Sequence, residues 1–186
     1  MKEARPRLAA ELVQVLDLAP HPEGGFFREV FRSERTVPSE SGERSSLTVI
    51  YFLLTADSFS AWHRLRSDET WHFAIGEPAT IEMFDENAGY RRTEIGPDGP
   101  WLAVIPAETT FAAHVDVPGG YALLTCCVAP GFDFADFTLV AGEALAAAFP
   151  EHTTLVQRYA RANGATTLST GAASAARTAS PKTSHT

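Results

Sequence analysis

Residues 60–76 hold the side chains whose types and spacing are best suited to chemistry. Two histidines, a glutamate and two tryptophans lie in two strand-like runs that a polar turn joins. In an extended strand every second side chain lies on the same face of the sheet. His63 then lies on the apolar face of the first run, and Glu69 shares a face with Trp71 and Phe73 in the second. We therefore expect His63 and Glu69 to face one cavity.

A histidine beside a carboxylate is a base with an orienting group. The ordinary pKa of histidine lies close to neutral pH, so a positioned imidazole is well matched to proton transfer. We predict that His63 is a general base and that Glu69 orients or tunes it. A non-catalytic alternative stays open, in which His63 is a hydrogen-bonded histidine of the core.

The pocket around this pair is expected to use aromatic and polar residues from the same runs and from a strand predicted over Phe26–Arg32. In that strand Phe27 and Glu29 lie on one face and Arg28 on the other. A structural role stays open for Arg28 and Glu29, which could pair across a dimer interface. A structural role also stays open for His72, because strand parity places it on the face opposite to Glu69. The candidate substrate-binding residues are Phe27, Arg28, Glu29, Trp71, His72 and Phe73.

Short strands separated by turns are predicted to position these residues. Residues 47–54 are the most apolar run and fit a buried strand at the centre of a sheet. After this run, turn-forming residues recur about every ten positions, which is typical of an antiparallel β-sandwich or barrel. The further strands are expected around Ile81, Tyr90, residues 101–105, Phe111 and residues 121–128.

Helices are expected near the two ends of the chain. Leu8, Leu12, Val15 and Leu16 recur at helical spacing after Pro6, so an N-terminal helix should pack on a sheet. Two short C-terminal helices are expected to cap the sandwich from outside, over residues 142–149 and 155–162.

Two segments are predicted to lack regular structure and side-chain chemistry. Residues 34–44 are polar and contain turn formers, so they are expected to form an exposed loop. The run around His21, which stands between two prolines, is predicted as a turn. Asp133 and Asp136 are expected to cap or close the mouth of the barrel.

Composition indicates one domain. A chain of 186 residues with 45% hydrophobic content can bury about 70% of its unfolded surface without a metal or a disulfide. From residue 164 onward, 18 of 23 residues are Gly, Ala, Ser or Thr, a composition that cannot offset the entropy of ordering the chain. We predict a single domain over residues 1–163, with its core at about 26–139, and a disordered tail over 164–186.

Charge and cysteine content exclude several partners and compartments. Lys and Arg total 15 against 23 Asp and Glu, for a net charge of −8, and no basic cluster stands out, so nucleic acid is not expected to bind. No apolar stretch is long enough for a signal peptide or a membrane span. The adjacent Cys126 and Cys127 alternate in side-chain direction and make poor disulfide partners, which indicates a reducing compartment. We expect a cytoplasmic protein without a membrane partner.

Five short motifs together resemble a small family of the cupin superfamily, long known as a domain of unknown function. They are PHPEGGFFRE, WHRLRSDETWHF, VIPA, GGY and VAPGFDFADF, which begin at residues 20, 62, 104, 119 and 128. The resemblance implies an all-β cupin fold, a double-stranded β-helix or jelly-roll sandwich, to which the predicted N-terminal and C-terminal helices add. It also implies a homodimer, and the strand at Phe26–Arg32, apolar on both faces, is the expected dimer interface.

The metal ligands that the cupin resemblance implies are only partly present. His63 and Glu69 match the first cupin motif, but Leu65 stands at its second histidine and Phe111 at the histidine of the second motif. A catalytic zinc or iron site generally needs three protein ligands. We therefore expect no metal cofactor, and a divalent metal at His63 and Glu69 is the disfavoured alternative.

A distant resemblance connects residues 23–29 with the Arg-Gly-x-Phe-x-Glu strand of cupin sugar-nucleotide 3,5-epimerases, whose base lies at the position of His63. Gly24 replaces the arginine that holds phosphate in those enzymes, and Glu69 replaces a lysine, which argues against a nucleotide sugar. We predict a metal-independent enzyme of the isomerase or epimerase type that uses a histidine base on a small carbonyl-bearing substrate. The alternatives are a divergent metal-dependent cupin enzyme, similar to an oxygenase, and a non-catalytic small-molecule binding module.

Overall fold

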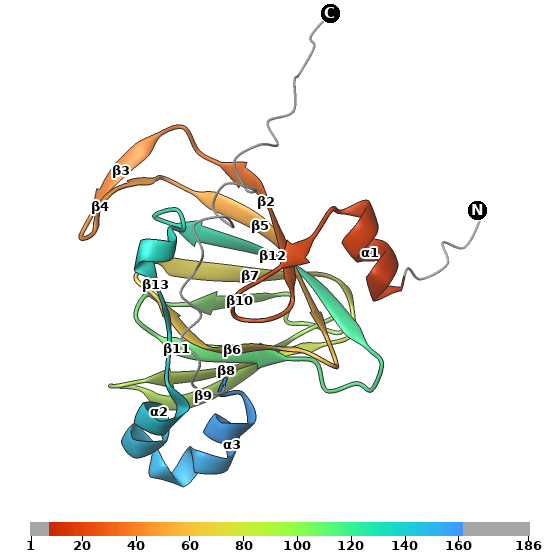
Figure 1. The fold of residues 1–186 in the computed structure, drawn as a ribbon, viewed down its shortest axis with the longest axis vertical. Coiled ribbons are helices and arrows are strands. Elements are labelled where there is room, and N and C mark those ends of the chain that lie inside the picture. Colours follow the sequence, from red (N-terminus) through yellow and green to blue (C-terminus); the bar gives the residue numbers. More distant parts are fainter. Residues whose placement is uncertain (1–7, 162–186) are drawn as a thin grey trace, which may run out of the picture.

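The computed structural model describes residues 8–161, and these form two facing β-sheets with helices outside them (Figure 1). All pairings within both sheets are antiparallel, which confirms the predicted jelly-roll sandwich. The six-stranded sheet has the order β1 (Ala19–Pro20), β2 (Phe26–Arg32), β5 (Thr48–Thr55), β12 (Tyr121–Ala129), β7 (Asp68–Gly76) and β10 (Leu102–Ile105). The five-stranded sheet has the order β13 (Phe137–Leu139), β6 (Phe59–Leu65), β11 (Thr110–His114), β8 (Ala79–Asp85) and β9 (Gly89–Ile95).

Helices cover the outer faces of the two sheets. The helical elements are α1 (Ala9–Val15), η1 (Phe134–Asp136), α2 (Gly142–Ala148), η2 (Pro150–His152) and α3 (Thr153–Arg158). The helix α1 packs on the six-stranded sheet, and α2 with α3 packs below the five-stranded sheet (Figure 1). No helix in residues 8–161 is long and apolar enough to cross a membrane. Pro6 and the tail predicted over residues 164–186 lie outside the described residues.

The buried side of α1 differs from the predicted stripe. Leu12 packs against Leu53 and Leu123 of the sheet, whereas Leu8 and Val15 are largely exposed. The helix begins at Ala9 and spans only two turns, so one narrow i, i+3, i+4, i+7 face is enough to cover the sheet. The side chains of that face are Ala9, Leu12, Val13 and Leu16.

Alternation along the strands decides which side chains lie between the sheets. The central strand β5 pairs with β2 on one side and β12 on the other, as its apolar sequence predicted. Phe52 and Leu54 face the interior, where they join Trp71 and Phe111, while Leu53 faces α1. Because strand side chains alternate with a period of two, β5 is buried on both faces.

The segment predicted as an exposed loop over residues 34–44 is mostly a hairpin. The strand β3 (Thr36–Ser39) pairs with β4 (Gly42–Ser45), and the hairpin projects from one edge of the sandwich (Figure 1). Pro38 and Gly42, the turn formers that indicated a loop, lie at positions that are compatible with a hairpin. Pro38 lies in a two-stranded ribbon, and Gly42 has a φ of 103°, a conformation that favours glycine.

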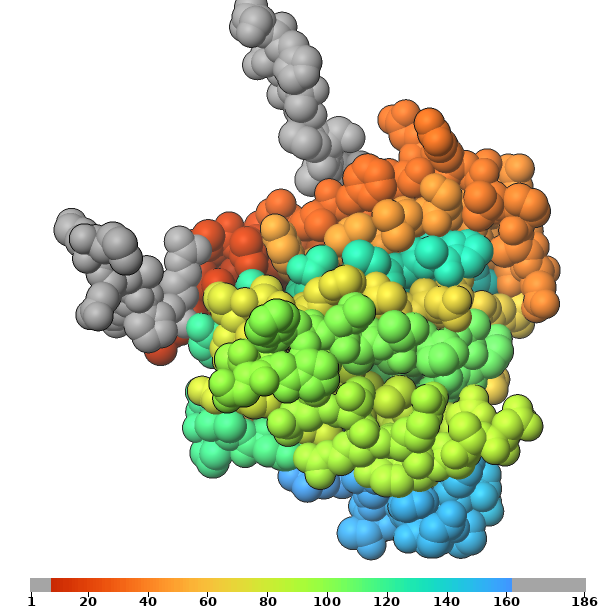
Figure 2. Space-filling view, turned by 180° about the vertical axis from the view of Figure 1, so that it is seen from behind, coloured from red at the N-terminus to blue at the C-terminus, as the bar shows by residue number. Residues whose placement is uncertain are grey.

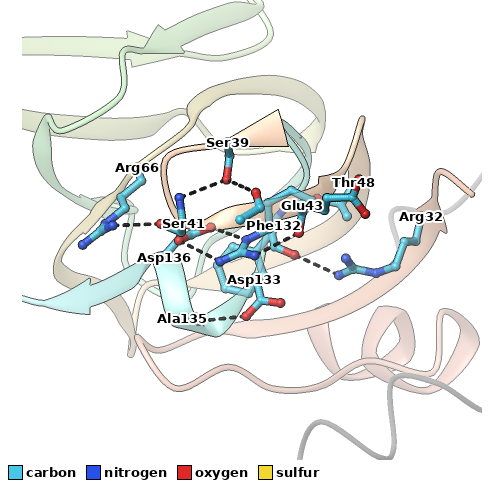
Figure 3. Close-up of polar contacts among 12 residues, drawn as sticks. Arg32, Ser39, Ser41, Glu43, Thr48, Arg66, Phe132, Asp133, Ala135 and Asp136 are labelled. Atoms are coloured by element: carbon cyan, nitrogen blue, oxygen red, sulfur yellow. Dashed lines mark hydrogen bonds and ion pairs between the residues drawn. The ribbon is translucent and has the colours of Figure 1, made fainter. Parts of the chain in front are cut away.

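Polar contacts bind this hairpin to the segment around η1 (Figure 3). Arg44 of β4 donates to both carboxylate oxygens of Asp136, at 2.6 and 3.2 Å. These hydrogen bonds from the Arg44 guanidinium hold the pKa of Asp136 below its ordinary value. Arg66 donates to the hydroxyl of Ser41 at the hairpin tip. The hairpin is therefore attached to η1 by charge and hydrogen bonding.

We expect Asp136→Asn to release the hairpin, because the change removes the charge that Arg44 contacts. Hydrogen–deuterium exchange should become faster in β3 and β4, and the melting temperature should fall by only a few degrees. Glu40→Gln, at an exposed residue of the same hairpin, is the control. Equal exchange in both variants would show that the ion pair does not hold the hairpin.

Candidate functional site

A buried polar cluster lies between the sheets. His63 comes from β6, Glu69 from β7 and Glu23 from the turn between β1 and β2, and all three side chains are buried. His63 and Glu69 both face the interior, as strand parity predicted. Phe111 packs against the His63 ring at a centroid distance of 4.0 Å and against the Trp71 ring at 5.9 Å.

The direct carboxylate partner of His63 is Glu23. Glu23 Oε2 lies 3.2 Å from His63 Nε2. On the other side of the ring, His63 Nδ1 lies 2.7 Å from the carbonyl oxygen of Ala61 and so carries a proton. Ser60 donates its hydroxyl to Glu23 Oε1 at 2.9 Å. Glu69, the partner predicted from spacing, makes no hydrogen bond to His63.

Glycine allows the turn to carry Glu23 into the interior. Gly24 has a φ of 121°, and a Cβ on it would lie 1.9 Å from the carbonyl oxygen of Phe59, so only glycine fits against β6 there. The Ala61 amide donates to the carbonyl oxygen of Glu23 at 2.8 Å and fixes the approach. Turns are usually exposed, and sequence reasoning therefore missed Glu23. The paired glycines after it were the signal of a close backbone approach.

His21 belongs to the same cluster, although it was predicted as a turn residue only. Its backbone lies in the turn, but its ring packs against Phe27 at 4.6 Å and Phe52 at 5.8 Å. Its Nδ1 accepts a hydrogen bond from the Glu23 amide at 3.3 Å and lies 3.4 Å from Glu23 Oε2.

Burial keeps the cluster uncharged at neutral pH. Burial raises the pKa of Glu23 well above its ordinary value, and repulsion between the ionised forms of Glu23 and Glu69 adds to the rise. Burial lowers the pKa of His63 to about 4 and that of His21 to about 3. Ser60 then donates to Glu23 and His63 Nδ1 donates to Ala61, while Glu23 Oε2 lies against both His63 Nε2 and His21 Nδ1.

Glu69 is a second neutral carboxyl. Burial raises its pKa to about 8, and the Trp71 indole partly offsets this rise. The indole N–H lies near the carboxyl but falls short of hydrogen-bonding geometry. The interior therefore holds two protonated carboxyls at neutral pH, one paired with His63 and one beside Trp71.

The predicted substrate-binding residues fall into two groups. Phe27, Trp71 and Phe73 pack into the interior cluster. The other three do not contact the polar cluster and have partners elsewhere. Arg28 donates to the Leu16 carbonyl oxygen under α1, Glu29 pairs with Arg32, and His72 is exposed on the outer face beside Thr70.

Aromatic side chains close this end of the interior. Phe137 packs on His63 at 5.4 Å, and both Phe134 and Phe137 lie within 6.5 Å of the His21 ring. They belong to the η1 segment that the hairpin holds. Two hollows lie on the surface. One of about 190 Å³ lies beside Tyr159, and one of about 450 Å³ behind Gly24 has His21 of the cluster in its lining.

The donor set does not fit a catalytic metal. Both His63 nitrogens already have partners, and Phe111 and Leu65 occupy the positions of the two missing histidines. Within residues 8–161, no group of three or more His, Cys, Asp or Glu side chains is arranged to hold a metal ion.

Comparisons with known proteins agree with this architecture. The sequence profile of the family described as "Cupin superfamily (DUF985)" matches residues 10–140. A hypothetical protein from Leishmania major is 34% identical, with a TM-score of 0.78 over 84% of this chain and 100% of that chain. A protein of Shewanella oneidensis with an X-ray crystal structure is 34% identical, with a TM-score of 0.77 over 84% and 99%. An uncharacterised protein of Saccharomyces cerevisiae is 28% identical over 162 residues, which cover 74% of this chain and 78% of the relative.

The neutral Glu69 carboxyl should make stability depend on pH. Its pKa is about 8 in the folded chain and near 4.5 when unfolded, so between these values only the folded state holds the proton. Stability must then fall as pH rises toward 8. His21 and His63 have lowered pKa values, so they favour the folded state more as pH rises to about 6.5 and have no further effect above it. The effect of the buried carboxyls is therefore clearest between pH 6.5 and 8.

We expect Glu69→Gln to reduce the fall in the free energy of unfolding with rising pH by up to about 1.4 kcal/mol per pH unit, because glutamine has no proton to lose. Urea unfolding at several pH values between 6.5 and 8 measures the slope. Glu151→Gln, at an exposed carboxylate, is the matched control. A slope that Glu69→Gln leaves unchanged would contradict a buried neutral carboxyl at this position.

Proposed function

The chain belongs to the DUF985 family of the cupin superfamily, and from this premise we propose that it is a metal-independent enzyme that moves a proton on a small carbonyl compound. The observation that supports the proposal is the buried contact of Glu23 Oε2 with His63 Nε2, which lie 3.2 Å apart. Perturbed, paired ionisable groups in a closed interior are typical of acid–base sites. The reaction class is isomerisation or epimerisation.

His63 acts together with Glu23 in this mechanism. In the resting state the neutral Glu23 carboxyl lies 3.2 Å from His63 Nε2. As the carboxyl takes a proton from the substrate carbon, its own proton passes to His63, so His63 is the net acceptor. The Ala61 carbonyl oxygen holds the opposite ring nitrogen and stabilises the imidazolium that forms. The interior then carries one positive and one negative charge, and no net charge accumulates.

The aromatic surroundings support a small and mostly apolar substrate. Phe27, Phe52 and Phe111 line the space around His21 and His63. Water excluded by these rings cannot compete for the proton, which strengthens hydrogen bonds between the reacting groups.

Solvent exchange tests the proposed chemistry directly. A panel of uncharged aldehydes and ketones is incubated with the protein in D₂O, and proton NMR measures loss of the α-hydrogen signal. His63→Asn should lower the exchange rate of any active compound by about 10²-fold or more, because the net acceptor is lost. His152→Asn, at a histidine outside the interior, is the control. Undiminished exchange in His63→Asn would eliminate this mechanism and favour a binding module.

We also propose that the protein is a homodimer, through a surface other than the one expected from sequence. The strand β2 is apolar on both faces because Phe27 lies in the interior and Phe26 lies under α1. The strand β2 exposes Val30 and Phe31, but a second open apolar surface with more exposed large side chains lies at the edge strand β10 and its neighbour β7, and β10 belongs to a face that no helix covers (Figure 2). Its exposed side chains are Ile75, Trp101, Leu102 and Val104. Two copies of an antiparallel edge strand can pair about a twofold axis.

We expect wild-type protein to be a dimer by light scattering and Val104→Glu to be a monomer, because a charge would be buried in the interface. Phe31→Glu changes an exposed aromatic residue of β2 and should leave the dimer intact. A wild-type monomer at micromolar concentration, or dissociation only in Phe31→Glu, would contradict the β10 interface.

A further inference from the structure

Four buried side-chain polar atoms in residues 8–161 have no hydrogen-bond partner, and one of them belongs to the main core cluster between the sheets. The indole nitrogen Nε1 of Trp71 is buried and donates to no atom of the described residues. The other two tryptophans are satisfied, since Trp62 Nε1 donates to the Val156 carbonyl oxygen at 2.8 Å and Trp101 Nε1 to that of Pro97 at 3.1 Å. A buried donor without an acceptor destabilises a fold, and such groups are rare in native proteins.

The unpaired indole lies beside a second buried group, the carboxyl of Glu69. The two residues are on the same face of β7, and the indole lies close enough to the Glu69 carboxyl to lower its pKa. Their neighbours in the interior are apolar, with Phe52, Phe111 and Cys126 packed around Trp71. Both groups therefore lie in an apolar interior, where Phe111 packs on the Trp71 and His63 rings alike.

We propose that Glu69 and Trp71 together form a two-donor site for the carbonyl oxygen of the substrate, a role that rests on the function proposed above. The raised pKa of Glu69 leaves its carboxyl protonated near neutral pH, so it can donate a hydrogen bond. Two preorganised donors in an interior that excludes water stabilise charge that develops on oxygen. This assignment differs from the orienting carboxylate that the sequence predicted for Glu69.

The step balances without a further reactant. The carbon–hydrogen bond next to the carbonyl breaks, and the proton enters the Glu23 and His63 pair. The electrons of that bond form a carbon–carbon double bond, and the π electrons of the carbonyl move to its oxygen, which becomes an enolate oxygen held by Glu69 and Trp71. Return of the proton to the opposite face or to the neighbouring carbon gives the isomer. No oxidant or reductant is required.

The same geometry specifies an uncharged substrate. Among the groups that affect the pKa of Glu69, the Trp71 indole is the one that lowers it, and none is a cation. The one cation that affects the polar cluster, Arg161, acts on Glu23 and His21 and is exposed. A carboxylate or phosphate beside Glu69 would be buried without a counter-charge, which is strongly unfavourable. A ketone, aldehyde or lactone carries only the oxygen that the two donors need.

The indole N–H signals of the full chain test this site without any activity assay. Protein with ¹⁵N-labelled tryptophan gives three indole signals, which Trp→Phe variants assign. We expect titration with cyclohexanone to shift the Trp71 proton downfield, as a new acceptor reaches it, while the Trp62 and Trp101 signals stay in place as internal controls. Cyclohexanecarboxylate, which has the same ring and a charge, should cause no shift.

Variants separate the two donors. Trp71→Phe and Glu69→Ala should each weaken cyclohexanone binding about tenfold, as expected for loss of one hydrogen bond. Because the Trp71→Phe variant lacks the Trp71 indole signal, the NMR signals of Glu23 report binding in that variant. Glu69→Gln keeps an N–H donor and should stay within about threefold of wild type. Trp101→Phe, at an exposed residue, should bind as wild type does. If Glu69→Ala does not fold, Trp71→Phe still tests the site.

The outcomes distinguish this inference from the proposed function. An unmoved Trp71 signal with cyclohexanone, or an equal response to the carboxylate, overturns the two-donor site. If solvent exchange of the substrate depends on His63 but the Trp71 indole signal does not shift, the two-donor site is also overturned. The proposed function is then still supported. A shift of Trp71 that persists in His63→Asn, together with loss of exchange in that variant, supports both.

Discussion

The buried contact between Glu23 and His63 is the constraint on which the rest of the site depends. Two ionisable groups are tolerated between the sheets because each is neutral and each has its polar atoms paired. This pairing requires the turn to approach β6 closely, and Gly24 is the residue that permits the approach. Removing one partner would leave the other buried and unpaired, so the turn, the strand and the polar cluster form one unit.

The same pairing explains how a cupin interior is filled without its usual ligand set. Phe111 packs directly on the His63 ring, at the position where the resemblance places another histidine. An aromatic ring there excludes water and supplies no donor atom to a metal. The glutamate of the first motif, Glu69, is then free of His63 and lies beside Trp71. The usual cupin ligand set and this polar cluster therefore differ by a few side chains on the same kind of sandwich.

The closure of the interior depends on polar contacts made far from it. Phe137 covers His63, while the neighbouring Asp136 is bound to Arg44 of the β3 and β4 hairpin. This ion pair is largely buried, so it ties the segment that covers His63 to the hairpin. The opposite faces, under α1 and above α2 and α3, are held by apolar packing.

Sequence by itself determined the strands, the jelly-roll class and the inward direction of His63 and Glu69, because alternation with a period of two is a local property of each strand. The sequence did not predict the contact between His63 and Glu23. A residue in a turn enters a core only through contacts with a distant strand, and here that strand is the one that includes Phe59. Tertiary structure alone decided that Glu69 lies beside Trp71, that His72 is exposed and that the 34–44 segment forms a hairpin bound to Asp136. Each of these depends on which surfaces meet when the two sheets close, and no local pattern encodes that.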